Sequence, residues 1–460
     1  MKKILALLLC LAMVFALAAC GNSSAPAQTP AEAPAEAPAE APAEAPAEAP
    51  AEAPAASGSV YYLNFKPEAD PAWQALAKVY TEQTGVPVKV VTAASGTYSD
   101  TLTAEMAKSE APTIYNIGNI SGLTDWNDYA LDLSGTAIYG ERVNDDYVLF
   151  DETGAPKALG YCYESFGIIV NKALLETAGH TLDEITNFDS LKAVADDIHA
   201  RAAELGFDAF SAPGLDGSSS WRFSGHLANV PLYYEYKDNG LNVGSLPATV
   251  TGAYLDNFRN IWDLYITDTA AVATSLSTST GDESEAEFGE GKAVFYQNGD
   301  WEYASLTGNF GISADDLAMI PIYCGVAGEE KAGLNSGTEN CWAVNSQASE
   351  ENIQASLDFL YWVVTSDEGT AMLAEQFSGI PFKSAAASNN VFGADAAAYA
   401  SAGNYTMFWA FNDTPNVDSW RATVVTALTA YSADPTDANW ASVVEAFVDG
   451  WAYEYSVVNG

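Results

Sequence analysis

The chain has 460 residues, and its 61 acidic side chains against 18 Lys and Arg give a formal net charge of −43. This balance excludes nucleic acid as a partner, because phosphate binding needs clustered Lys and Arg. The five cysteines and three scattered histidines have no spacing typical of a metal site, so we expect no metal and no other cofactor.

Residues 1–19 have the pattern of a secretory signal peptide. A basic start is followed by an apolar run over residues 4–17, which is shorter than the ~20 residues that span a bilayer. The sequence Leu17-Ala-Ala-Cys20 resembles the lipobox of bacterial lipoproteins. The match implies cleavage before Cys20 and a lipid on its thiol, and the alternative is an ordinary signal with an incidental cysteine.

Residues 20–58 are predicted to be a lipidated Cys followed by a spacer. The tetrapeptide Ala-Glu-Ala-Pro repeats from Ala31 to Pro54. A proline at every fourth position prevents a continuous helix, and the regularly spaced Glu keeps the segment solvated. A tether of this kind, with a reach on the order of 100 Å, suits a protein held on the outer face of the cytoplasmic membrane.

A globular body begins near residue 59, and its roughly 400 residues favour two lobes rather than one core. Predicted strands alternate with predicted helices over its first part, which favours a mainly parallel sheet with helices on both faces. The strands are expected at residues 60–65, 86–92 and 113–117, with helices carrying Trp73 to Tyr80 and spanning residues 97–108. Lys66, Glu68 and Asn119 follow two of these strands and are candidate ligand contacts, or else solvated turn residues.

Glu164 is the most informative acid in the sequence. It lies among apolar residues just before a predicted strand, and Asn171-Lys172 then opens a helix. An unpaired carboxylate in such surroundings would be costly, so Glu164 needs a partner. Two partners are open: a ligand, or a neighbouring Lys or Arg in a salt bridge.

Two tryptophans of the next segment are placed at helix starts. Trp221 ends a polar loop that begins at Gly214. Gly289 and Gly291 end a helix, residues 292–297 read as a strand, and Asn298-Gly299-Asp300 predicts a turn in which Asp300 caps a helix and Trp301 lies in its first turn. Ligands collect at the carboxyl ends of strands in open α/β sheets, so both indoles are candidate plates, with core packing as the alternative.

The last part of the chain is expected to cross between the lobes. Residues 339–344 read as a return strand that begins with Glu339, and Thr365 and Glu368 have the spacing of a capping box. Trp409, Trp420 and Arg421 precede a long helical tail, and each indole is either core or ligand contact. Cys324 and Cys341 flank a Gly-rich turn, and a disulfide between them stays open.

Several motifs together resemble one family. These are F-x-x-G-K-A-x-x-x-x-x-G-x-W at residues 288–301, Thr365-Ser-Asp-Glu-Gly-Thr-Ala, Gly379-Ile-Pro, and the lipobox. The chain resembles the extracellular solute-binding proteins, family 1, which are carbohydrate-binding components of ABC importers. The resemblance implies an α/β fold of two lobes, joined by a hinge with a ligand cleft between them. Lobe 1 would contain residues 59–163 with 337–398, and lobe 2 residues 164–336 with 399–460.

The resemblance also implies a function and a site. In maltose-binding proteins the Glu seven residues before the Asn of Asn-Lys contacts sugar, and Glu164 has this spacing from Asn171. At Ile117 to Ile120 those relatives place a tryptophan and an acid, which this chain lacks, so a maltose-type ligand is in doubt. The candidate ligand-binding residues are Lys66, Glu68, Asn119, Glu164, Trp221, Asp300, Trp301, Glu339, Trp409, Trp420 and Arg421.

We therefore expect a monomeric, lipid-anchored binding protein that delivers a carbohydrate, in the first place an oligosaccharide, to a membrane permease. The alternative is a lipoprotein that binds peptides, amino acids or a metal chelate. A cell-surface glycosidase is a further alternative, but no acid pair stands out as proton donor and nucleophile, and no Ser-His-Asp order is evident.

Overall fold

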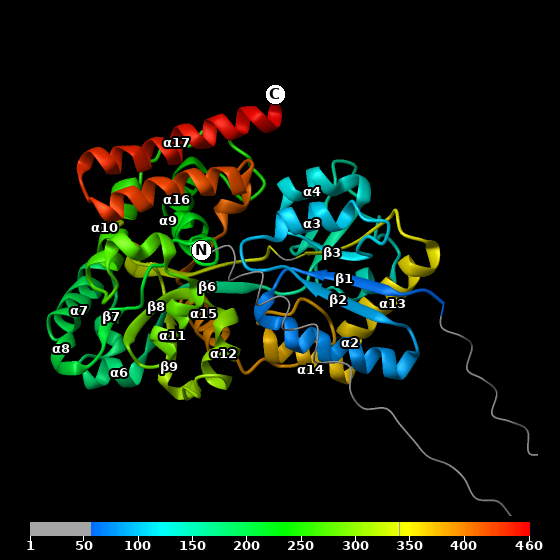
Figure 1. Ribbon diagram of the computed structural model, residues 1–460, viewed down its shortest axis with the longest axis horizontal. Helices are drawn as coiled ribbons and strands as arrows, with labels where there is room; N and C mark the ends of the chain where they lie inside the picture. The colour runs from blue at the N-terminus through cyan, green and yellow to red at the C-terminus, as the bar shows by residue number, and fades with distance from the viewer. Residues whose placement is uncertain (1–56, 340) are drawn as a thin grey trace, which may run out of the picture. The chain divides into compact units, whose positions relative to one another are not determined.

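The computed structural model describes residues 57–339 and 341–460. The predicted signal peptide, Cys20 and the Ala-Glu-Ala-Pro linker lie outside the described residues. Two six-stranded sheets organise the described part of the chain, and each has its own helices and its own apolar core (Figure 1). The expected two-lobe α/β fold is therefore present, and we call the sheets and their helices lobe 1 and lobe 2.

Lobe 1 has the strand order β2-β1-β3-β11-β5-β4. The strands β1, β2 and β3 run parallel, as the alternation of elements predicts, whereas β11 pairs antiparallel with both β3 and β5. The strands are β1 (Val60–Asn64), β2 (Val88–Thr92), β3 (Ile114–Ile117), β4 (Val148–Phe150), β5 (Pro156–Gly160) and β11 (Cys341–Val344). The helices of this lobe are α2 (Asp70–Thr84), α3 (Tyr98–Met106), α4 (Ile120–Trp126), α5 (Ala137–Glu141), α13 (Glu350–Thr365) and α14 (Asp367–Gln376).

Helix α2 shows how the sequence pattern builds lobe 1. Its buried residues are Trp73, Leu76, Ala77 and Tyr80, which recur at helical spacing on one face. The Trp73 ring packs edge-on against Tyr62 of β1 and Trp342 of β11, with centroids 5.1 and 5.9 Å apart. The helix ends where Gly85 adopts a φ of 77°, a left-handed conformation that glycine adopts readily.

Lobe 2 has a mixed sheet around the long strand β6. The order is β12-β10-β6-β8-β7, and β9 pairs with the second half of β6 on the same side as β10. The strands are β6 (Glu164–Asn171), β7 (Asp208–Phe210), β8 (Ala293–Gly299), β9 (Leu317–Ile320), β10 (Ala332–Gly337) and β12 (Tyr405–Phe408). The helices are α6 (Lys172–Thr177), α7 (Phe188–Ala200), α8 (Ala202–Leu205), α9 (Ala228–Asn239), α10 (Leu255–Thr267), α11 (Gly281–Gly289), α12 (Tyr303–Gly308), α15 (Val391–Ser401), α16 (Val417–Ala433) and α17 (Asp437–Asn459).

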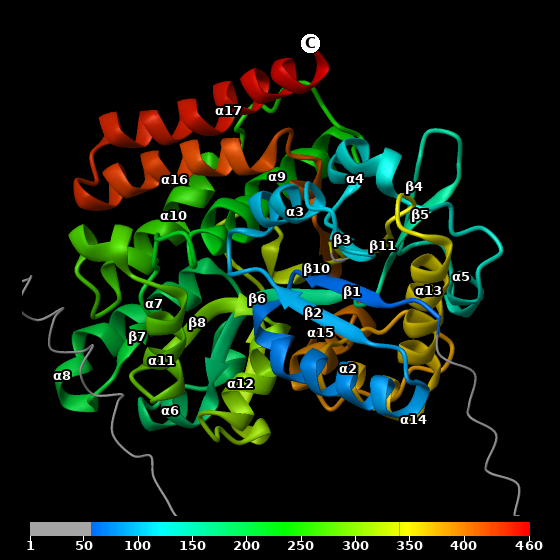
Figure 2. The same cartoon turned by 45° about the vertical axis from the view of Figure 1, so that its right-hand side comes forward.

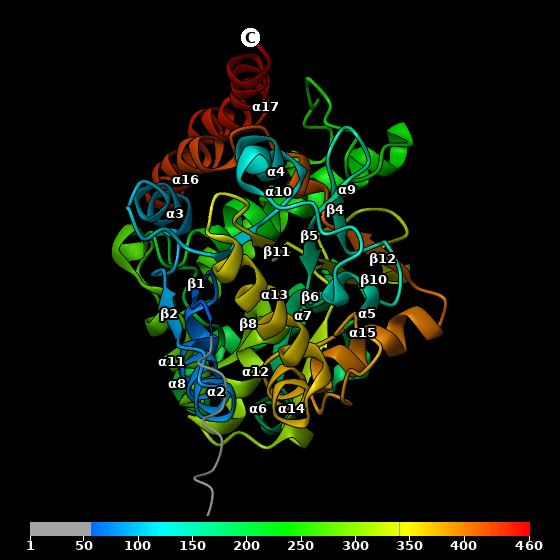
Figure 3. The ribbon, with the colours of Figure 1, turned by 90° about the vertical axis from the view of Figure 1, so that its right-hand side faces the viewer.

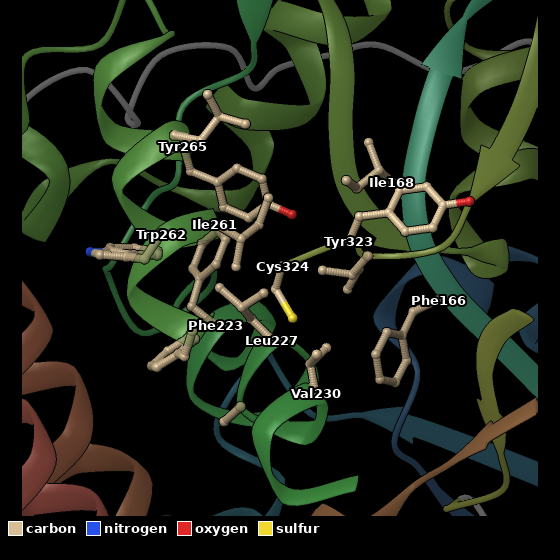
Figure 4. Close-up of a cluster of buried hydrophobic side chains, with 14 of the residues drawn as sticks. Phe166, Ile168, Phe223, Leu227, Val230, Ile261, Trp262, Tyr265, Tyr323 and Cys324 are labelled. Carbon is tan, nitrogen blue, oxygen red and sulfur yellow. The ribbon is translucent and has the colours of Figure 1, made fainter. Parts of the chain in front are cut away.

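The core of lobe 2 joins helix α10 to a π-helical segment, η4 (Arg222–Leu227). The Phe223 ring packs against Trp262 and Tyr265 of α10, with centroids 5.0 and 6.2 Å apart (Figure 4). Phe166 of β6 belongs to the same core. The segment that follows the predicted Trp221 loop is thus anchored in the interior of lobe 2.

Two chain crossings between the lobes run side by side. Strand β5 leads into β6, β10 leads into β11, and the two paths are antiparallel: Gly160 pairs with Cys341 and Glu164 pairs with Gly337. The third crossing lies between Phe382, which bridges to Arg142 in lobe 1, and α15, which packs on β9 and β10 (Figure 3). The predicted boundary was residue 398, whereas α15 packs on strands of lobe 2 and therefore belongs with lobe 2.

Two local predictions need correction, and the open question of a disulfide between Cys324 and Cys341 is answered. Ser366 and not Thr365 caps α14, because its hydroxyl accepts from Gly369 N while Thr365 ends α13. Cys324 and Cys341 are both free and lie in different lobes, as β11 carries Cys341 and lobe 2 buries Cys324. The sheets are mixed and not mainly parallel, since β6 pairs antiparallel with β8, β9 and β10.

Helices α16 and α17 pack against each other at the end of the chain (Figure 2). No helix in the part of the chain that the structure describes combines the length and apolar character of a membrane span.

Candidate functional site

A buried ion pair joins the two lobes. Lys66 follows β1 of lobe 1 and is 4% exposed, and its Nζ lies 2.8 Å from Oε1 of Glu164, the first residue of β6 in lobe 2. A second, weaker contact of 3.4 Å links Lys66 to the exposed Glu68. Asn64 holds the turn, because its amide donates to Lys66 O and its Oδ1 accepts from Lys66 N. Of the two partners left open for Glu164, the structure contains the lysine.

The charge state of Lys66 follows from this environment. Burial alone acts to lower the pKa of Lys66, but the nearby carboxylates of Glu164 and Glu68 outweigh it and hold the pKa well above its ordinary value. The ammonium therefore stays charged, and a buried charge of this kind is tolerated because it is paired.

Asp300 lies beside this pair and does not cap a helix, contrary to the prediction. Strand β8 continues through Gly299, and Asp300 opens a 3₁₀ turn, η6 (Asp300–Glu302), without a side-chain cap. Its Oδ2 instead accepts from Ser165 N at 2.9 Å and from the Ser378 hydroxyl. Burial, followed by the charge of Glu164, raises the pKa of Asp300 to about 8. Asp300 is thus largely a neutral acid at pH 7.

Six aromatic rings from lobe 2 gather next to these charges. His226 is the centre: it stacks on Phe166 at 4.2 Å between centroids and lies 5.2 Å from Trp301. Trp221 and Trp301 are 6.0 Å apart. We call this set the ring cluster; its members are Phe166, Trp221, His226, Trp301, Trp409 and Phe411.

The rings differ in how deeply they are buried, and this difference distinguishes candidate stacking surfaces for a ligand from core residues. Trp221 and Trp301 are half-buried, whereas Trp409 is 1% exposed. The Trp301 ring lies directly on the backbone of Gly299, where a Cβ would clash with it, and Lys66 Nζ is 5.2 Å from the ring centroid. A glycine is therefore required at position 299, and it turns the indole toward lobe 1.

Polar candidates lie around the second chain crossing. Glu339 is half-buried, and burial raises its pKa although Arg421 and Lys66 oppose the rise. The Arg421 guanidinium lies 5.7 Å from the Phe411 centroid and so close to Gly225 that a Cβ there would be 2.6 Å from it. Asn119 accepts from Gly122 N at 2.9 Å and caps α4, which contacts the turn η9 (Ala410–Asp413) of lobe 2.

The position of Trp420 argues against its predicted role as a ligand contact. It is 1% exposed, and its Nε1 donates to Phe447 O of α17 at 3.0 Å. Its ring packs edge-on against Phe447 and Trp451, with centroids 4.8 and 6.0 Å apart. Trp420 therefore fastens α16 to α17, and its side chain faces away from the ring cluster's charged neighbours.

Sequence reasoning missed His226 and Phe166. Burial, followed by the charges of Arg421, Lys66 and Arg222, holds the pKa of His226 well below its ordinary value, so the imidazole is neutral. A period of two along β6 would have placed Phe166 on the face of Glu164, and that signal was available. His226 carried no signal, because its place follows from the π-helical turn.

A separate hollow of about 360 Å³ lies on lobe 2 and contains none of the predicted site residues. Its lining is formed by Ala212, Ala271, Ser275, Ser279, Glu283, Ala286, Glu287, Glu290 and Lys292. It has no aromatic ring and opens to the surface, so we place the candidate site at the ring cluster. Over residues 57–339 and 341–460, no group of three or more His, Cys, Asp or Glu is arranged to hold a metal ion.

Comparison with known proteins gives a consistent result. A family model described as bacterial extracellular solute-binding protein matches residues 75–401. A search of curated proteins returned no match. Among solved structures, the chain is similar to the GacH receptor of Streptomyces glaucescens GLA.O, solved unliganded and in complex with acarbose, with 17% identity, a TM-score of 0.65, and coverage of 87% of this chain and 99% of that one.

Two further structures have the same fold. A chitin oligosaccharide binding protein is 15% identical with a TM-score of 0.67, covering 88% of this chain and 100% of that one. The bacterial solute receptor AcbH, which has an exclusive substrate preference for β-D-galactopyranose, is 14% identical with a TM-score of 0.67, covering 87% of this chain and 100% of that one.

The raised pKa of Asp300 predicts a pH-dependent stability. Between about pH 4, where an unfolded Asp ionises, and about pH 8, the folded state binds one more proton than the unfolded state. The free energy of unfolding should therefore fall as pH rises through this window, by up to about 1.4 kcal/mol per pH unit from this group. Asp300→Asn keeps an acceptor oxygen and should flatten the slope in urea unfolding measured from pH 5 to 8. Asp315→Asn, at an exposed position, is the control. An unchanged slope in Asp300→Asn would contradict the raised pKa of Asp300.

The packing of Trp420 predicts a stability effect. Trp420→Ala removes a fully buried indole and should lower the free energy of unfolding by about 3–5 kcal/mol in chemical denaturation. Trp301→Ala, which truncates a half-buried ring, should cost clearly less. Equal losses of unfolding free energy in the two variants would indicate that Trp301 is a core residue.

Proposed function

Because this chain belongs to the bacterial extracellular solute-binding proteins, we propose that it captures a carbohydrate between its two lobes and delivers it to the membrane permease of an ABC importer. The family resemblance drawn from the motifs is confirmed by the family match. The proposal includes a lipid on Cys20 that tethers a monomer to the outer face of the cytoplasmic membrane.

The observation that carries the carbohydrate proposal is the pair of half-buried indoles, Trp221 and Trp301, 6.0 Å apart on lobe 2. Sugars present flat C–H faces bordered by hydroxyl groups, and a partly exposed indole offers an apolar plate of matching size. Trp409 is 1% exposed and joins the ring cluster through His226, with centroids 6.2 Å apart.

The charges near the ring cluster favour a neutral ligand. Lys66 is balanced by Glu164, Arg421 lies near Glu339, and Asp300 is largely protonated at pH 7. The buried ammonium of Lys66 is thus already paired within the protein, which favours a ligand without a full charge over a free amino acid or a metal chelate. A hydroxyl both donates and accepts, so it suits the mixed rim of amide, carboxyl and guanidinium groups at this site.

Buried polar atoms without a partner among the described residues support the same reading. They include the indole nitrogen of Trp409, Nδ1 of His226 and Nε of Arg421. Leaving such groups unsatisfied is costly, and ligand hydroxyls placed next to them would relieve that cost.

Residues of both lobes take part in the site, so ligand binding should favour closure. Lys66 belongs to lobe 1 and the ring cluster to lobe 2, and a ligand that touches both binds the closed form more tightly. A micromolar dissociation constant corresponds to about −8 kcal/mol, which stacking and hydrogen bonds can supply after the cost of closure.

An enzymatic role has weaker support. The family consists of binding proteins, and the two most buried acids of the site are engaged in structure. Glu164 pairs with Lys66, and Asp300 accepts from Ser165 and Ser378. We therefore propose that the protein binds its ligand without turnover.

The test is a glycan panel screened by thermal shift, followed by calorimetry on the best ligand. Trp221→Ala and Trp301→Ala should each weaken binding at least about tenfold, or about 1.4 kcal/mol, because each removes a stacking surface. Trp362→Ala is the matched control, since it removes a half-buried indole from α13 of lobe 1 and should leave affinity unchanged.

Three outcomes would contradict the proposal. A response to peptides alone would favour the other class of binding lipoprotein. Release of reducing ends from oligosaccharides would indicate a glycosidase. Wild-type affinity in both Trp221→Ala and Trp301→Ala would show that the ring cluster is not part of the binding site.

A further inference from the structure

The turn between β2 and α3 contacts lobe 2 at backbone distance. Gly96 has a φ of +74°, and a Cβ at this position would lie well under 3.0 Å from Gly217 O. The chain reaches from lobe 1 toward lobe 2 at this turn (Figure 2). Only glycine combines the left-handed conformation with so close an approach, so the contact depends on Gly96 for two independent reasons.

One carbonyl oxygen links this turn to a candidate plate. Ser95 Oγ donates to Ser218 O at 3.3 Å, and the same oxygen accepts from Trp221 Nε1 at 2.8 Å. Docking of the lobe 1 turn and orientation of the Trp221 indole therefore share one acceptor.

The lobe 2 side of this contact is rigidly held. Asp216 Oδ1 accepts from both the amide and the hydroxyl of Ser218, at 3.0 and 2.7 Å. The Ser218 hydroxyl also accepts from Gly281 N at 3.0 Å, which ties the loop to the start of α11. The buried Arg222 donates to Ser219 Oγ at 2.7 Å and to Gln297 O at 3.1 Å. The loop is thus a fixed platform before lobe 1 arrives.

The lobe 1 side is a compact turn of its own. Thr97 N and Thr97 Oγ1 both donate to Ala94 O, at 3.0 and 2.8 Å, and α3 starts at the next residue. These bonds present Ser95 and Gly96 at the tip of the turn. Each of the two contacting surfaces is therefore held by hydrogen bonds within its own lobe.

We propose that the turn Ala94–Thr97 is a latch that docks on the loop Asp216–Trp221, stabilises the closed arrangement and fixes the Trp221 indole for binding. Gly96 acts as a positioning residue, because it works through the loop and through Trp221. The affinity readout of this proposal rests on the proposed function, whereas the contact itself does not.

The test compares two glycines of lobe 1 in the full-length protein. Gly96→Ala should open the lobes, because the new Cβ meets Gly217 O. Gly135→Ala is the control: Gly135 has a φ of +76° but nothing within 4 Å of its Cβ position, so it adds the same backbone strain without a clash. Both variants should lose thermal stability to a similar degree.

Only Gly96→Ala should increase the radius of gyration in small-angle X-ray scattering. It should also weaken binding of the best glycan at least about fivefold, because the binding-competent state becomes less populated. Ser95→Ala, which removes one hydrogen bond and adds no clash, should weaken binding less and covers the case in which Gly96→Ala fails to fold.

The latch proposal is contradicted if Gly96→Ala and Gly135→Ala have the same radius of gyration and the same glycan affinity. If Gly96→Ala does not fold, the proposal is contradicted when Ser95→Ala binds the glycan as tightly as the wild type. If the wild type binds no glycan, the proposed function fails and the radius of gyration alone decides on the latch. An increase in that radius confined to Gly96→Ala would then still support it.

Discussion

The buried pair of Lys66 and Glu164 is the interaction on which the candidate site depends. Each residue belongs to a different lobe, and neither charge would be tolerated in this environment without the other. Their contact fixes the end of β1 against the start of β6. Trp301 and Phe377 then lie within 6 Å of the Lys66 ammonium, at 5.2 and 5.9 Å, and burial, followed by the charge of Glu164, raises the pKa of Asp300. A single electrostatic requirement therefore sets both the geometry and the charge of the site.

Periodicity in the sequence was enough to predict the first elements of lobe 1, from β1 to β3, because helix α2 and its neighbours follow local rules. The spacing of Trp73 and Tyr80 and the stop at Gly85 are each decided within one helix. The need for a partner at Glu164 was also predictable, since it follows from the cost of a buried charge. The identity of that partner was not, because Lys66 becomes a neighbour only when the lobes meet.

The failed predictions are those in which a tertiary contact overrides a local signal. Asn298-Gly299-Asp300 reads as a turn with a cap, yet Gly299 pairs with Phe166 and prolongs β8, and Asp300 then finds Ser165 and Ser378. Trp420 stands next to Arg421 in sequence, but successive helix residues point in different directions. Arg421 faces Gly225 and Phe411, while Trp420 faces α17.

Two of the interlobe contacts, the Lys66–Glu164 pair and the approach of Gly96 to Gly217, differ in kind. The Lys66–Glu164 pair lies in the interior beside the chain crossings, where its charges are shielded from water. The contact of Gly96 with Gly217 lies at the tip of a turn and involves no charge. Between them stands the ring cluster, whose burial decreases from Trp409 to the half-buried Trp221 and Trp301. The Trp221 indole donates to the loop that contacts the turn at Gly96, and the Trp301 ring lies beneath the ammonium of Lys66. Each half-buried indole is therefore adjacent to one of the two contacts. A ligand that contacts both Trp221 and Trp301 would therefore bind tightly only when both of these interlobe contacts have formed. Binding to one lobe alone would not require this.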